Sequence, residues 1–95
     1  MWEIRFEDRV HREDDLTIAM SRRIEELTGT DWAMLNPLRS ANHALSILTV
    51  MHAAATGEPE AAVQKRVGAL RVNDFVRAMQ PADDDLPALY QDGNP

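Results

Sequence analysis

The chain has no cysteine among its 95 residues. This absence excludes a disulfide framework, a thiolate zinc site and catalysis by a thiol. The chain also has no hydrophobic run long enough to cross a bilayer, and its first residues lack the basic start and apolar stretch of a secretion signal. We therefore expect a soluble cytoplasmic protein that is not secreted and does not bind a membrane.

Catalytic motifs are missing as well. The four glycines stand apart from one another, so no phosphate-binding loop is expected. No serine lies in a Gly-x-Ser-x-Gly or Ser-x-x-Lys pattern, and the adjacent carboxylates of the chain are typical of solvated surfaces, where a raised pKa is not expected. The sequence therefore predicts a protein that is not an enzyme and that has no catalytic residue or cofactor.

Histidine is the remaining candidate for metal binding. His43 and His52 are nine residues apart on one expected helix, which places them on opposite faces, so they cannot share a metal ion within one chain. His11 lies beside Glu13 and Asp14 and is expected to be an ordinary surface histidine. His52 is expected to be a hydrogen-bonded residue of the core or of an interface. No metal site is predicted.

Acidic and basic residues are unevenly distributed. Residues 1–80 contain twelve acids and ten bases, whereas residues 81–95 contain four aspartates and no base. A nearly balanced body has little attraction for phosphate, so we expect no binding to nucleic acid. We interpret the chain as one domain at 1–80 followed by a flexible acidic tail at 81–95, which is either solvated or in contact with a basic partner. A single small core leaves a thin stability margin, to which a homo-oligomer or a protein partner would add.

The first residues alternate in polarity. Trp2, Ile4 and Phe6 are separated by charged residues, which is the period of a half-buried strand. A second strand follows near Val10 to Arg12, so a β-hairpin is predicted at about 2–13, with its apolar face on the helices or on another chain. Its outer edge would remain unpaired, either solvated by charged side chains or open to a strand from a partner.

Four to five helices are expected after the hairpin, so the fold class is mainly α, with α+β character. One helix should begin at Asp15 or Thr17 and end at Gly29. A central helix is predicted at about 40–56, capped by Ser40 and apolar on nearly every side, so that the other helices pack around it.

The remaining segments give shorter helices. A turn after Thr30 holds Trp32, which we expect to anchor this connection in the core. Pro59 opens a further helix, and Asn73 can cap a last helix that carries Phe75 and Met79 before Pro81 stops it.

The first 40 residues resemble a known family. The run Asp15-Leu16-Thr17, then Ile24-Glu25-Glu26-Leu27-Thr28-Gly29, followed by Trp32 and Leu35 behind the Trp2-x-Ile4-x-Phe6 hairpin, is similar to the tail assembly chaperones of long-tailed, siphovirus-type phages. The likeness is greatest to those of actinobacterial phages and prophages, and the later helices agree in layout.

The resemblance implies a protein that binds the tape measure protein during tail assembly and is absent from the finished virion. Such chaperones are often made in a short form and a frameshifted longer form. Two alternatives are a structural head-tail connector or completion protein of a phage and a small acidic regulatory module that binds a protein. Our candidate contact residues are Trp2, Phe6, Trp32, Leu86, Leu89 and Tyr90.

Overall fold

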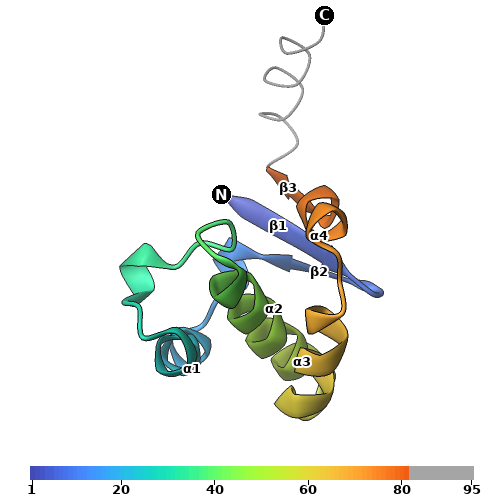
Figure 1. Cartoon of the computed structure of the whole chain (residues 1–95). Coiled ribbons are helices and arrows are strands. Elements are labelled where there is room, and N and C mark those ends of the chain that lie inside the picture. Colours follow the sequence, from blue (N-terminus) through green and yellow to red (C-terminus); the bar gives the residue numbers. More distant parts are fainter. Residues whose placement is uncertain (82–95) are drawn as a thin grey trace, which may run out of the picture.

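The computed structural model describes residues 1–81 of the chain (Figure 1). It is mainly helical and begins with an antiparallel hairpin, as predicted. The expected flexible tail at 81–95 lies outside the described residues from 82 onward. The elements in order are β1 Trp2–Phe6, β2 Arg9–Arg12, a 3-10 turn Glu13–Asp15, α1 Ile18–Thr28, a 3-10 turn Trp32–Met34, α2 Ala41–Thr56, α3 Glu60–Gly68, α4 Val72–Ala78 and β3 Met79–Pro81.

Helix α2 is the centre of the helical layer. It packs against α1, α3 and strand β2, and Figure 1 shows it between α1 and α3 with the strands across its other side. Every residue from Ser46 to Ala53 is buried. Since a helix that is apolar on most sides must be covered on most sides, this placement follows from the composition of the segment.

The ends of α1 and α2 are fixed by the capping residues that the sequence predicts. Thr17 Oγ1 accepts a hydrogen bond of 3.0 Å from the backbone N–H of Met20. Ser40 Oγ accepts one of 3.1 Å from the backbone N–H of His43. Both helices end at a glycine in the left-handed region, Gly29 with φ 69° and Gly57 with φ 80°, where a residue without Cβ is favoured.

The two glycines at the ends of α2 and α3 should respond in opposite ways to alanine. Gly57→Ala should lower the free energy of unfolding by about 1 kcal/mol, because a left-handed φ is strained for an L-residue even though the added Cβ has open space. Gly68→Ala should be neutral or stabilising by up to about 1 kcal/mol, because Gly68 is helical and its Cβ would meet only Leu45 Cδ1 at 3.9 Å. Urea denaturation of both variants measures the difference, and equal effects would contradict the assignment.

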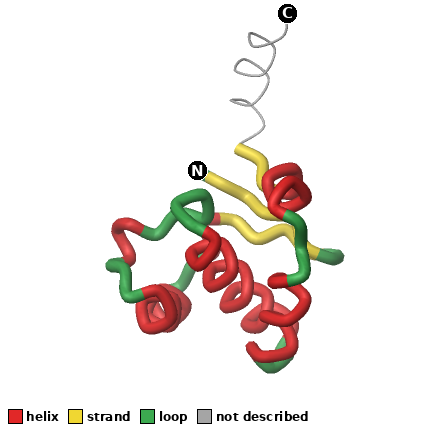
Figure 2. Tube along the Cα trace, viewed as in Figure 1, coloured by secondary structure: helices red, strands yellow, loops and turns green. Residues whose placement is uncertain are grey.

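The sheet has three strands where the sequence predicts two. Strand β1 is central in the order β2-β1-β3, and Ile4 is paired with His11 on one side and with Met79 on the other. The expectation that Met79 belongs to the last helix is therefore wrong. Of the two outer edges of the hairpin, that of β1 is paired with β3 and that of β2 has no neighbouring strand within residues 1–81. Helix α4 ends at Ala78, and the chain turns directly into β3 (Figure 2). Pro81 has no N–H to donate and is compatible with an edge strand.

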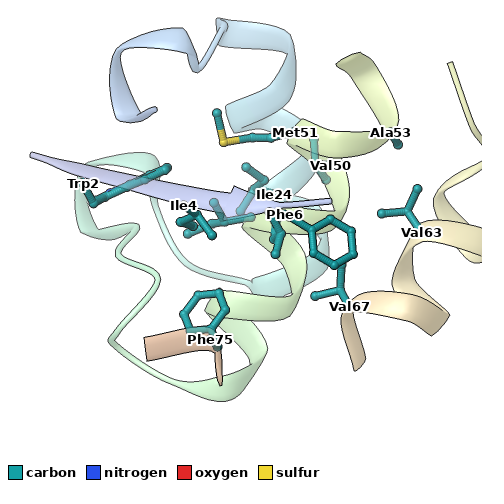
Figure 3. Close-up of a cluster of buried hydrophobic side chains, with 12 residues drawn as sticks. Trp2, Ile4, Phe6, Ile24, Val50, Met51, Ala53, Val63, Val67 and Phe75 are labelled. Atoms are coloured by element: carbon teal, nitrogen blue, oxygen red, sulfur yellow. The ribbon is translucent and has the colours of Figure 1, made fainter. Parts of the chain in front are cut away.

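The apolar core lies between the sheet and the helices. Ile4, Ile24, Ile47, Leu48 and Val63 have no exposed surface. Figure 3 shows how the side chains from the strands and the helices converge on one cluster. Its members are Trp2, Ile4, Phe6, Ile24, Ile47, Leu48, Val50, Met51, Ala53, Val63, Val67 and Phe75.

Candidate functional site

An apolar groove lies where α2, α3 and α4 meet the turn before α2. It has a volume of about 440 Å³, and its walls include Leu45 of α2, Val67 of α3 and Phe75 of α4. Ser40 is the one residue with a polar side chain among the described residues that line it. Water in a groove of this composition finds few groups to hydrogen-bond with. The hydrophobic effect therefore favours the binding of an apolar group in the groove.

Three large apolar side chains at this groove are exposed. Leu38 is 61% exposed, Val72 is 76% exposed and Val76 is 50% exposed. Val72 and Val76 are one turn apart on α4 and share a face. Phe75 of the same helix is buried and also lines the groove. Single exposed apolar residues are ordinary, but three that converge on one apolar groove are typical of a binding surface.

A second cluster is polar and partly buried. Strand β2 supplies His11, α2 supplies His52, and the hairpin turn supplies Glu7. His11 Nε2 and His52 Nδ1 are 2.9 Å apart, and His52 Nε2 lies 3.0 Å from Glu7 Oε1. Because a carboxylate only accepts, Nε2–H of His52 donates to Glu7, and Nδ1 of a neutral His52 accepts from Nε2–H of His11. Both ring nitrogens of His52 thereby have a hydrogen-bond partner.

Arg66 of α3 closes this cluster on its exposed side. Its Nε donates to Glu7 Oε2 at 2.8 Å, and its Nη2 donates to Glu58 Oε2 at 2.9 Å. These hydrogen bonds lower the pKa of Glu7 and of Glu58, and they raise the pKa of Arg66. Burial lowers the pKa of His11 to about 4. A positive charge on His52, when that ring is protonated, and the charge of Arg9 act in the same direction, against Asp15. The cluster therefore holds a neutral His11 beside ionised carboxylates.

One serine and one histidine also meet. Ser40 Oγ lies 2.8 Å from Nδ1 of His43, while Nε2 of His43 is buried and has no hydrogen-bond partner within residues 1–81. A catalytic pair needs a third group that orients the imidazole, and no such group hydrogen-bonds to Nε2 of His43 among the residues that the structure describes. Because Ser40 also caps α2, the contact fits a capping role better than a nucleophilic one.

The predicted contact residues are not brought together. Trp2 and Phe6 are 8% and 6% exposed and belong to the core, so their side chains offer little surface to a partner. Trp32 is 63% exposed, so the expectation that it anchors its connection in the core is wrong. Its backbone N–H instead donates to Glu25 Oε2, which fixes the turn without burying the indole. Leu86, Leu89 and Tyr90 lie outside the described residues.

The two histidines of this cluster differ in how well the sequence predicts them. The expectation of a hydrogen-bonded His52 is confirmed, but the expectation of a surface His11 is wrong, because His11 is 4% exposed. The cluster joins residues 41 and 45 positions apart, which no local spacing reveals. The alternation of polarity along the hairpin could have indicated that His11 is buried. Ile4 and His11 are cross-strand partners and share a face of the sheet.

Comparison with protein-family models, with curated proteins and with solved structures gives no match. Within residues 1–81, no helix combines the length and the apolar character that a membrane crossing requires.

Proposed function

We propose that this protein is a phage tail assembly chaperone that binds an apolar helical segment of the tape measure protein in the groove between α2, α3 and α4. The observation that carries the proposal is the apolar groove itself, with Leu38, Val72 and Val76 exposed at its edge. The resemblance of the first 40 residues supplies the identity of the partner. No catalytic role is proposed.

The apolar composition of the groove and the elements that line it favour a helix as the occupant. An amphipathic helix places apolar residues at positions i, i+3, i+4 and i+7 on one face, and such a face is commonly bound in an apolar groove between helices. The walls of this groove come from three helices and the turns that precede and connect them. A tape measure protein is long and rich in helix, so it offers many such faces before it is built into a tail.

Trp32 is a second candidate for contact with the tape measure protein, separate from the groove. The indole is at the surface and lies on the turn between α1 and α2. Large aromatic side chains contribute strongly to protein interfaces. Trp2 and Phe6 are not part of the proposed surface, because they stabilise the core.

A charge placed in the groove should weaken binding to the tape measure protein. Val72→Asp and Val76→Lys should each raise the dissociation constant at least tenfold, about 1.4 kcal/mol, because a buried charge without a partner is unfavourable. Both side chains are largely exposed in the free protein, so folding should be unchanged. The measurement is co-purification after co-expression with the adjacent tape measure gene product, followed by calorimetry.

Ile18→Asp is the matched control, because Ile18 is 80% exposed and lies on α1, away from the groove. It should bind as the unmodified protein does. If the folded protein and a folded tape measure protein do not associate, the proposal fails. Presence of the chain in purified phage particles would instead favour the structural connector.

A further inference from the structure

Three side chains with metal-ligating atoms meet beside α2, at a distance from the apolar groove. They are Glu7 of the hairpin turn, His52 of α2 and Glu58 of the connection to α3, and one ligand atom from each lies within 4.8 Å of the other two. Imidazole nitrogen and carboxylate oxygen are both zinc ligands, so one histidine with two glutamates suits zinc, whereas magnesium and calcium prefer oxygen alone.

The distances suit a tetrahedral ion. His52 Nε2 lies 3.0 Å from Glu7 Oε1 and 4.0 Å from Glu58 Oε2. With metal–ligand bonds of about 2.0 to 2.2 Å, neighbouring ligand atoms of a tetrahedral site are about 3.4 Å apart. The observed separations lie on both sides of that value. The glutamate side chains are 41% and 36% exposed, so small rotations would bring their oxygens to the required positions.

His52 is already held in a fixed orientation. Its side chain is 2% exposed, its ring packs edge-on against Phe6 with centroids 4.7 Å apart, and its Nδ1 lies 2.9 Å from Nε2 of His11. A histidine that binds a metal through one nitrogen is usually held by a hydrogen bond at the other. With a metal on Nε2, the proton of His52 would sit on Nδ1 and be donated to Nε2 of His11, whose own proton moves to its Nδ1.

Arg66 shows that the site attracts positive charge. Its guanidinium bridges the two carboxylates, at 2.8 Å from Glu7 and 2.9 Å from Glu58. Two carboxylates and one guanidinium leave a charge of −1, whereas two carboxylates and one Zn²⁺ are neutral. The arginine side chain is 37% exposed and can turn into solvent. The guanidinium and a Zn²⁺ ion would therefore compete for the same position between the two carboxylates.

We propose that Glu7, His52 and Glu58 form a zinc site, in which His11 orients His52 and Arg66 competes with the metal for the two carboxylates. The fourth ligand would be water on the exposed side. This site is separate from the proposed chaperone function and does not depend on it.

The test uses the full chain without an affinity tag, treated with a chelator and then titrated with Zn²⁺ in a calorimeter. Arg66→Gln should bind one Zn²⁺ at least tenfold more tightly than the unmodified protein, because the competing cation is gone. Glu58→Gln should bind at least tenfold more weakly. Both positions are partly exposed, so the variants should fold, which circular dichroism checks. His43→Gln is the control, since it removes a buried histidine of the same helix outside the site and should leave zinc affinity unchanged.

An ion-pair network without a metal function makes different predictions. In that case Arg66→Gln would bind Zn²⁺ no more tightly than the unmodified protein, and Glu58→Gln would make no difference. Either result would overturn the proposal, as would binding of several Zn²⁺ ions with equal affinity in all four proteins. As a second measurement, saturating Zn²⁺ should raise the Tm of Arg66→Gln more than that of Glu58→Gln.

Discussion

Replacing Ile4 by alanine should lower the free energy of unfolding by about 3 kcal/mol, within the range found for large-to-small substitutions in cores. Ile4 is fully buried and lies on the central strand, between His11 of β2 and Met79 of β3. The surrounding positions are fixed by backbone pairing on both sides, so the structure has little freedom to close the cavity. A domain of this size has roughly 5 to 10 kcal/mol in total, and much of that margin would be lost.

Ile18→Ala removes the same atoms from a side chain that is 80% exposed. We expect a change within about 0.5 kcal/mol for this variant, because little apolar surface returns to water. Urea denaturation followed by circular dichroism gives both values. A loss below about 1 kcal/mol for Ile4→Ala would mean that β1 is not the buried central strand.

Lowering the pH from 7 to 4 should destabilise the protein by up to about 3 kcal/mol through His11. Burial holds the pKa of His11 near 4 in the folded state, below the ordinary value of 6.5. Between these two values the unfolded chain binds a proton that the folded chain does not, so stability falls as pH falls through this window. Below about 4.5 the lowered pKa values of Glu7 and Glu58 add to the loss, as their hydrogen bonds with Arg66 require ionised carboxylates.

Denaturant midpoints at a series of pH values, measured with a chelator present, test this dependence. His11→Gln removes the titrating imidazole and keeps a group that can hydrogen-bond to His52. Its stability should therefore change much less between pH 6.5 and 4.5 than that of the unmodified protein, although it starts lower at pH 7. Parallel curves for the two proteins would show that His11 is not the titrating group.

Helices α1 and α2 were predictable because their signals are local, whereas the expectation that Asn73 caps the last helix is wrong, since α4 begins at Val72. Thr17 and Ser40 begin α1 and α2, and Gly29 and Gly57 end them, as the sequence indicates. Each cap depends on a side chain and a backbone group within a few positions. The hairpin was also predictable from local signals. The alternation of polarity in its first strand indicates which side chains are buried, and a two-residue turn joins the two strands.

Strand β3 was not predictable in this way. Met79 continues the helical spacing of Phe75, and Pro81 was interpreted only as a helix stop. The actual partner of Met79 is Ile4, at the other end of the described chain. Strand pairing at such a separation leaves no periodic signal in a segment of three residues, so tertiary structure overrides the local pattern.

The candidate sites, like strand β3, depend on contacts between distant parts of the chain, which local sequence patterns do not reveal. The sequence predicts the last helix, but spacing alone does not show that α2 and α3 leave a groove open beside its residues Val72 and Val76. The pair His11 and His52 required the hairpin to be placed on α2. Trp32 was expected inside and lies outside, because the short 3-10 turn that holds it stays at the surface.

The pairing of β1 with β3 also orders events during translation. Strand β1 leaves the ribosome before the other described elements and can join β2 early, since only two residues separate them. Its second neighbour cannot arrive until the chain has been made as far as Pro81. Until then one edge of β1 is unpaired, and any helix that packs on the sheet earlier packs on two strands and not three. The last three described residues to be synthesised therefore complete the sheet by pairing with a strand that was made much earlier.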